Sequence, residues 1–291
     1  MVRRTATFAV GVDGQHLLVM SAHRSTISDL PHALDSAELW RERLGSRPPA
    51  LFLDYDGVLT PIVDDPAAAT LGDDMREAVR QAADRLTVAV ISGRDLDDVR
   101  AMVDLPGLAY AGSHGFDMLL PDGSRERKGD EYLDDLDAVE RALRDELADA
   151  EGVTVERKRY AIAVHTRRAR DEATRRRAGA VVDDLATDVD RLRVTGGREI
   201  KEFRPDLDWD KGRALVRLTE VLDLDVDRHP PVYFGDDLTD EDAFAAIAHD
   251  GVGVVVAGAE DRPTAAHVRL DHPGQTEQLL RFLAELTTKA D

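Results

Sequence analysis

The sequence contains no cysteine among its 291 residues. Disulfide cross-links and thiolate metal sites are therefore excluded. No run approaches the roughly 18 consecutive apolar residues that a membrane-spanning helix needs. The apolar stretch near the N-terminus is interrupted by Asp13 and is too short to favour a secretory signal peptide. These absences favour a cytoplasmic protein with no membrane-embedded part.

Lysine is also scarce. The chain has 5 Lys against 33 Arg and 17 Glu against 41 Asp, and its formal net charge is −20. So acidic a surface disfavours general binding to nucleic acids or to anionic membranes. High genomic GC content would account for the arginine excess and a high-salt cytoplasm for the aspartate excess, and the sequence leaves both causes open. Each remaining lysine is for this reason a candidate for a specific role.

Hydrophobic residues make up 43% of the chain, enough for a sizeable core. Five short apolar runs each end at a small or acidic residue: 51–53, 88–91, 108–111, 232–234 and 252–256. Continuous short runs of this kind predict strands buried on both faces. Helical patterns lie between several of them, which predicts an α/β fold with a doubly wound, Rossmann-like parallel sheet. Ligands of such sheets bind beyond the carboxyl ends of the strands.

The middle of the chain differs from its flanks. Residues 119–204 combine two helical patterns with three strand-like stretches, two of them around Gly196-Gly197. This pattern predicts a small α+β domain inserted into a core formed by residues 46–118 and 205–291. Residues 1–45 are weakly patterned, and a hairpin around Asp13-Gly14 is the only element expected there. We assign that segment no role.

Two acidic motifs follow predicted strands. Asp54-Tyr55-Asp56-Gly57 comes directly after the first, and Gly235-Asp236-Asp237-Leu238-Thr239-Asp240 follows another. Like charges at a strand end raise each other's pKa, and a hard cation such as Mg²⁺ relieves the penalty. A solvated turn is the alternative for the first motif, and a capped helix start is the alternative for the second.

Two further elements are weaker by themselves. Ser92-Gly93-Arg94 ends the second strand, where a hydroxyl and main-chain N–H groups at a helix start suit an anion. Lys211 stands at the start of an amphipathic helix, and a compact ammonium suits a phosphate or an acyl phosphate. A capped glycine turn and a paired surface lysine are the respective alternatives.

In this order, D-x-D-G, S-G-R, a lone Lys and G-D-D-x-x-D, the four elements resemble the haloacid dehalogenase-like phosphatases across about residues 50–118 and 205–291. The resemblance implies that Asp54 is the nucleophile and that Asp56 is first general acid and then general base. It implies Mg²⁺ held by Asp54, the main-chain carbonyl of Asp56 and Asp236, with Asp237 and Asp240 supporting bound waters. It also implies that Ser92, Gly93, Arg94 and Lys211 bind the phosphate.

Further stretches narrow the resemblance to the trehalose-6-phosphate phosphatases. They are Leu51 to Ile62, Gly112 to Asp117, Glu156-Arg157-Lys158, His165-Thr166-Arg167, Glu202-Phe203-Arg204-Pro205 and Asp208 to Gly212. In that family the inserted domain is a cap that closes over the sugar. The resemblance places Glu156, Lys158, Arg167 and Glu202 at the sugar, and a solvated hairpin is the alternative for Glu156-Arg157-Lys158-Arg159. His114 stands in a Gly-rich loop at the end of a core strand, a position that favours contact with the substrate. His165 either lines the same cleft or packs within its strand, and we favour packing.

The sequence therefore predicts a Mg²⁺-dependent hydrolase that converts trehalose 6-phosphate into trehalose and phosphate through an aspartyl-phosphate. A trehalose-phosphate synthase is the expected functional partner. A phosphatase for another sugar phosphate is the nearest alternative. A non-catalytic sensor that binds the sugar phosphate is an alternative of another class, although it would not need Asp54, Asp56, Lys211 and Asp236 together. A mutase is a third, but no phosphoryl-reorienting feature is visible.

Overall fold

The five apolar runs form the parallel centre of an eight-stranded sheet. In the computed structural model, which describes residues 25–63, 68–196, 199–258 and 260–286, the strand order is β12-β11-β10-β1-β2-β3-β4-β5. The central strands are β1 (Ala50–Leu53), β2 (Val88–Ile91), β3 (Ala109–Gly112), β10 (Pro231–Gly235) and β11 (Val252–Val256). All five are parallel to their neighbours in this centre. The predicted α/β fold with a doubly wound sheet is confirmed.

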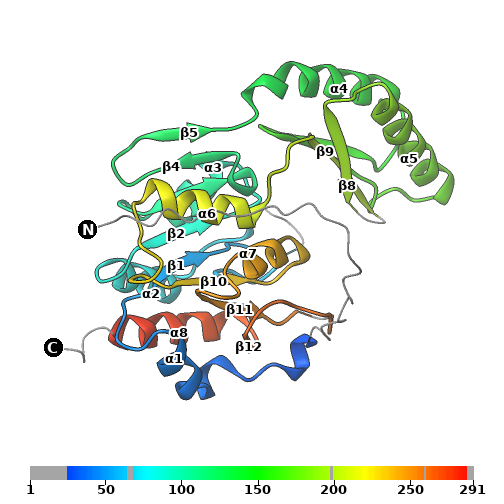
Figure 1. Cartoon of the computed structure of the whole chain (residues 1–291). Coiled ribbons are helices and arrows are strands. Elements are labelled where there is room, and N and C mark those ends of the chain that lie inside the picture. The colour runs from blue at the N-terminus through cyan, green and yellow to red at the C-terminus, as the bar shows by residue number, and fades with distance from the viewer. Residues whose placement is uncertain (1–24, 64–67, 197–198, 259, 287–291) are drawn as a thin grey trace, which may run out of the picture.

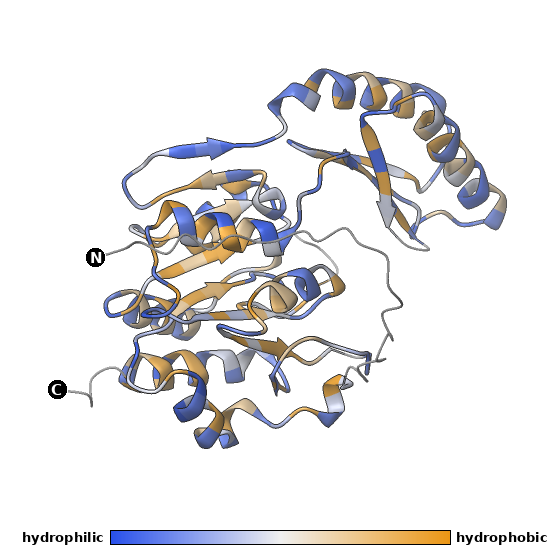
Figure 2. Cartoon of the chain, in the orientation of Figure 1, coloured by the Kyte–Doolittle hydropathy of each residue, from blue (hydrophilic) through white to orange (hydrophobic). Residues whose placement is uncertain are grey.

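Short strands extend this sheet at both edges. β12 (Val268–Leu270) pairs in parallel with β11, whereas β4 (Asp117–Leu119) and β5 (Arg125–Arg127) add an antiparallel hairpin beyond β3. The core sheet therefore continues through Arg127, whereas the sequence pattern places the start of the inserted domain at residue 119. Figure 2 shows why the pattern is weak there, because β5 is hydrophilic throughout.

Helices cover both faces of the sheet. The two faces alternate along each strand, so Leu51 and Leu53 of β1 join one hydrophobic cluster and Phe52 joins the other. The first cluster includes side chains of α1 (Ala37–Arg43), α2 (Asp73–Ala83), α3 (Leu96–Val103) and α8 (Pro273–Leu286). The second includes side chains of α6 (Lys211–Val221) and α7 (Glu241–Ala246). Short 3₁₀ turns are η1 (Ile27–Asp29), η2 (Ala33–Asp35), η4 (Ser113–Gly115), η5 (Asp130–Tyr132) and η6 (Leu238–Asp240).

The inserted domain is a separate sheet with two helices on it (Figure 1). Its antiparallel strands have the order β6-β7-β9-β8. They are β6 (Thr154–Lys158), β7 (Ala161–His165), β8 (Leu192–Gly196) and β9 (Ile200–Pro205), and the helices are α4 (Leu133–Glu146) and α5 (Glu172–Thr187). Leu143, Ile162 and Phe203 belong to a hydrophobic cluster of its own. Two chain crossings, one after β5 and one before α6, join it to the core (Figure 1).

Residues 25–45 pack on the core. Trp40 of α1 is fully buried, and its indole N–H donates to the carbonyl of Ala33 over 2.8 Å. The hairpin expected around Asp13-Gly14 and the turn residue Gly197 lie outside the described residues. Within the part of the chain that the structure describes, no helix is long and apolar enough to cross a membrane.

Candidate active site

Three carboxylates from two strand ends converge on one lysine. Asp54 follows β1, Asp236 follows β10, and Asp240 lies one turn further along in η6. Each offers an oxygen within 4.8 Å of those of the other two. The ammonium of Lys211, the first residue of α6, lies 2.6 Å from an oxygen of Asp54 and 2.6 Å from an oxygen of Asp240. The carboxyl ends of neighbouring parallel strands thus bring the two acidic motifs together.

Burial and mutual repulsion perturb these groups. Burial raises the pKa of Asp54 to about 7, against the pull of Lys211 in the opposite direction. Burial and the charges of Asp54 and Asp240 raise the pKa of Asp236 to about 8. Burial disfavours the charge of Lys211, but the two adjacent carboxylates outweigh it and raise the pKa of the ammonium. A divalent cation bound by these oxygens would relieve the repulsion, so the donor set suits a hard metal ion.

Main-chain geometry makes this convergence possible. Gly57 has a φ of +74°, and a Cβ at this position would lie 2.1 Å from a carboxylate oxygen of Asp236. Only glycine lets the two loops approach so closely. Asp240 is fixed by three hydrogen bonds, because it accepts from the Tyr233 hydroxyl and from the main-chain N–H groups of Asp236 and Asp237. Its side chain therefore organises the loop as well as pairing with Lys211.

Asp237 and Asp56 line the same cavity as these carboxylates but have other hydrogen-bond partners. The Asp237 side chain accepts from the N–H of Leu238 over 2.6 Å and caps η6. Asp56 is held by Arg94, whose Nε and Nη2 lie 2.8 and 2.7 Å from the two carboxylate oxygens. Ser92 is fully buried, and its N–H donates to the carbonyl of Ala111.

A charged cluster links the inserted domain to the core. The Glu202 carboxylate accepts from Lys158 Nζ over 3.2 Å and from Arg204, which also donates to Nε2 of His114 over 2.8 Å. Burial would raise the pKa of Glu202, but Lys158 and Arg204 outweigh it and hold this pKa below its usual value. Burial and nearby cations, Arg204 first, lower the pKa of His114 well below its usual value. An imidazole that accepts at Nε2 carries its proton on Nδ1.

The other predicted sugar-binding residues do not all lie at the same place. Glu156 and Lys158 lie two residues apart on β6, and their side chains line the same cavity, as this spacing predicts. His165 lies 2.7 Å from the Glu156 carboxylate and lines the same cavity, so it does more than pack within its strand. Arg167 follows β7 and lies 3.8 Å from Glu199, outside the residues that line either cavity at the carboxylates.

Two cavities meet at this site. One of about 510 Å³ contains Asp54, Lys211 and Asp236, and the other, of about 430 Å³, is bordered by Glu156 and Lys158 of the inserted domain. Asp56, Ile62, Gly93 and His114 line both of them. The first has room for a phosphoryl group beside the carboxylates, and the second extends it toward the charged cluster.

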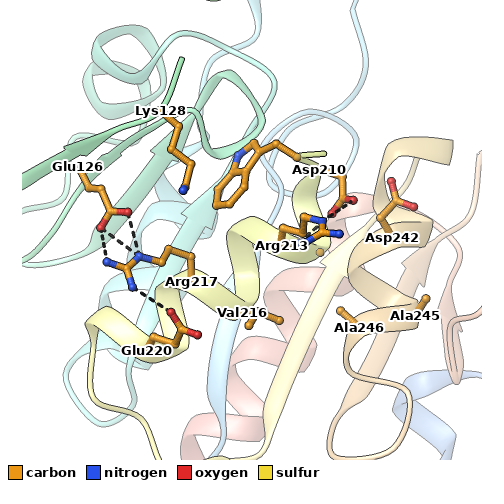
Figure 3. Close-up of a pocket in the computed structure, with 12 residues that line it drawn as sticks. Glu126, Lys128, Asp210, Arg213, Val216, Arg217, Glu220, Asp242, Ala245 and Ala246 are labelled. Atoms are coloured by element: carbon orange, nitrogen blue, oxygen red, sulfur yellow. Dashed lines mark hydrogen bonds and ion pairs between the residues drawn. The ribbon is translucent and has the colours of Figure 1, made fainter. Parts of the chain in front are cut away.

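A larger cavity, of about 700 Å³, lies elsewhere on the core. It runs along α6 between β5 and α7 (Figure 3). Several of its charged side chains pair with one another, because Arg217 pairs with Glu126 and with Glu220. It contains none of the three converging carboxylates, and size alone therefore does not mark the reactive site.

Sequence reasoning missed two residues that hold the site together. Arg204 joins Glu202 to His114, and its position two residues after Glu202 on the same strand was the available signal. Asp95 accepts from the Ser113 hydroxyl over 2.7 Å and from the N–H of Arg159, in the turn between β6 and β7, over 3.0 Å. No local pattern marks Asp95, because its partners come from distant parts of the chain.

The parallel sheet with its inserted domain has the same fold as a haloacid dehalogenase-like hydrolase from Bacteroides thetaiotaomicron, which superposes with a TM-score of 0.60 at 13% identity. The family model described as trehalose-phosphatase matches residues 52–274. The trehalose-phosphate phosphatase of Mycobacterium tuberculosis is 41% identical over 301 residues, covering 99% of this chain and 75% of that protein. The chain belongs to the trehalose-phosphatase family.

Two other proteins are similar to this chain. An uncharacterised glycosyl hydrolase of Mycobacterium tuberculosis is 45% identical over 273 residues, which are 89% of this chain. The chain spans only 20% of the length of that relative. The solved structure of the trehalose-6-phosphate phosphatase C-terminal domain of Candida albicans superposes with a TM-score of 0.71 at 26% identity, covering 88% of this chain and 99% of that one.

Proposed function

We propose that this protein hydrolyses trehalose 6-phosphate to trehalose and inorganic phosphate. The observation that carries the proposal is that Asp56 lines both of the cavities that meet at this site. On one side lie the buried carboxylates and Lys211, and on the other lies a cavity bordered by charged side chains of the inserted domain. Family membership favours the same substrate, and a trehalose-phosphate synthase is its expected source.

Asp54 is the proposed nucleophile. One of its oxygens attacks phosphorus, the bond from phosphorus to the sugar oxygen breaks, and the leaving oxygen takes a proton from Asp56. In the second step Asp56 accepts a proton from water, whose oxygen attacks phosphorus and releases the Asp54 carboxylate. Lys211 lies 2.6 Å from Asp54, and its charge reduces the repulsion between a carboxylate and an anionic phosphate.

The proposed phosphate contacts are Ser92 and Gly93 together with Lys211. The donor set of Asp54, Asp236 and the main-chain carbonyl of Asp56 suits Mg²⁺, with Asp237 and Asp240 as outer supports. The chemistry that Mg²⁺ supplies when bound is neutralisation of the phosphoryl oxygens. The raised pKa values of Asp54 and Asp236 support such a cation, because burial and the neighbouring carboxylates penalise their charges by more than Lys211 compensates.

The inserted domain is proposed to recognise the sugar. Lys158 and Glu156 border the second cavity with charged groups that form strong hydrogen bonds to hydroxyls, and His114 lies where the two cavities meet. Glu202 lines neither cavity and is linked to this surface through its pair with Lys158. The sequence resemblance also assigns Arg167 to the sugar. Its place outside both cavities means that this contact needs the inserted domain to move toward the core.

The proposal is tested by phosphate release from trehalose 6-phosphate with Mg²⁺, using the wild type and Asp54→Asn. We expect rapid release by the wild type and a loss of several orders of magnitude in the variant, which keeps the size of the side chain. The matched control is Asp122→Asn in an exposed turn, which leaves turnover unchanged. Binding of the sugar phosphate by the wild type without any release would instead identify a sensor.

A further inference from the structure

Arg94 forms a two-point ion pair with the proposed acid and base. Its Nε and Nη2 each donate to a different oxygen of Asp56, over 2.8 and 2.7 Å. Both carboxylate oxygens are engaged, which fixes the plane of the carboxylate as well as its position. The Arg94 side chain is 14% exposed and the Asp56 side chain is 41% exposed, so the guanidinium is the anchored partner.

The surroundings of Arg94 hold its guanidinium in place. The guanidinium carbon lies 5.5 Å from the centroid of the Tyr55 ring, and the Tyr55 hydroxyl is itself fixed by donating to the carbonyl of Ala69. The Arg94 carbonyl accepts from the N–H of Ser113. The side chain and the backbone of Arg94 are thus both restrained before any substrate binds.

Arg94 and the proposed phosphoryl position belong to different cavities. The cavity that contains Asp54, Lys211 and Asp236 is lined by Asp56 but not by Arg94. Arg94 lines the second cavity, next to Glu156 and Lys158. It therefore stands on the side where the proposed function places the sugar, and Asp56 lies between it and the reacting phosphorus.

We propose that Arg94 is a positioning residue that holds the Asp56 carboxylate at the junction of the two cavities, where the leaving oxygen and later the attacking water must meet it. This inference rests on the proposed function. It gives Arg94 a different task from the phosphate contact that the sequence resemblance implied. The residue acts through Asp56, and its guanidinium does not bind the phosphoryl group.

Steady-state kinetics of Arg94→Gln and Arg94→Lys distinguish the two tasks. We expect kcat to fall by about 10- to 100-fold in Arg94→Gln, a part of the roughly 10²- to 10⁴-fold that an acid–base group contributes. The KM and the inhibition constant of inorganic phosphate should stay within about twofold of wild type. Lysine keeps the charge but lacks the planar fork, so Arg94→Lys should remain impaired. A rise in both constants, or recovery with lysine, would overturn the inference.

A double-variant comparison tests the route through Asp56. In an Asp56→Asn background, Arg94→Gln should change the single-turnover rate by less than about twofold, because the group it positions is already gone. Independent losses that multiply would refute the inference. Arg125→Gln is the matched control, since Arg125 forms the same two-point pair with Asp117 away from the site, at 2.7 and 2.5 Å.

All variants are assayed with both trehalose 6-phosphate and p-nitrophenyl phosphate. A wild-type enzyme that hydrolyses only the second compound would refute the proposed substrate. The comparison of Arg94 with Asp56 would still be decided, because water attack on the phosphorylated enzyme needs the same base with either compound. An error in the proposed substrate and an error in the role of Arg94 would therefore give different experimental results.

Discussion

Gly57→Ala should lower activity by about 100-fold, because it displaces a neighbouring carboxylate and does not unfold the protein. The glycine lies between the two acidic loops, and an added Cβ would lie 2.1 Å from Oδ2 of Asp236. Contact distances of about 3.5 Å between non-bonded heavy atoms require the carboxylate to move by about 1 Å or more. An aspartate side chain rotates easily, so the overlap is relieved by moving Asp236 away from Asp54.

The two consequences of the substitution have different magnitudes. Alanine at a φ of +74° carries a backbone cost of roughly 1–2 kcal/mol, which lowers the melting temperature by about 2–4 °C for each kcal/mol. A misplacement of about 1 Å within an active site can cost about 10²-fold in rate. We therefore expect a modest loss of stability together with a fall of about 100-fold in kcat/KM.

Gly123→Ala is the matched control. Gly123 has a φ of +84°, but nothing lies within 4 Å of an added Cβ there. Both variants should lose similar melting temperature in thermal unfolding, and only Gly57→Ala should lose phosphatase activity in a phosphate-release assay. Full activity of a folded Gly57→Ala, with the same thermal shift as the control, would refute the conclusion that Asp236 must stay beside Asp54.

Three further results are expected. Glu202→Ala should lower kcat/KM on trehalose 6-phosphate by about 10- to 100-fold, from the roughly 1.5–3 kcal/mol of a charge-assisted hydrogen bond, while p-nitrophenyl phosphate changes by less than about threefold. Equal losses on both compounds in kinetic assays would place Glu202 in the fold instead. Mg²⁺ at about 100 times its Kd should raise the unfolding free energy by about 2.7 kcal/mol in calorimetry, and Asp236→Asn should remove most of that gain. Lys211→Met should leave Asp54 and Asp240 uncompensated and cost about 3–5 kcal/mol in denaturant unfolding without Mg²⁺, and an unchanged midpoint would contradict the stabilising role of the lysine.

The centre of the core sheet could be predicted because short, continuous apolar runs bounded by small or acidic residues are typical of strands buried on both faces. The edges of the sheet could not be predicted in this way. Arg125-Glu126-Arg127 forms β5 with no apolar residue, and an ion pair from Arg125 to Asp117 of β4 supports it in place of hydrophobic burial. The boundary of the inserted domain was misplaced for this reason. Residues 25–45 have no periodic pattern, yet Trp40 is a core residue.

The site could be predicted where neighbouring strand ends bring motifs together. Asp54, Asp236, Asp240 and Lys211 converge as the sheet topology requires, and their roles stay predictions. The partners of individual side chains were harder to predict from the sequence. Arg94 and Asp56 are 38 residues apart, and nothing local shows that the guanidinium turns toward this carboxylate. The orientation of long charged side chains depends on the assembled fold.

The most direct test of the central claim is the ratio of kcat/KM for trehalose 6-phosphate to those for sucrose 6-phosphate, glucose 6-phosphate and p-nitrophenyl phosphate, all with Mg²⁺. If the inserted domain recognises the whole disaccharide, trehalose 6-phosphate should exceed each of the others by at least about 100-fold, since unpaired charged groups in the site penalise a poorer match. Similar rates on all four compounds would contradict the assignment of the inserted domain to this sugar.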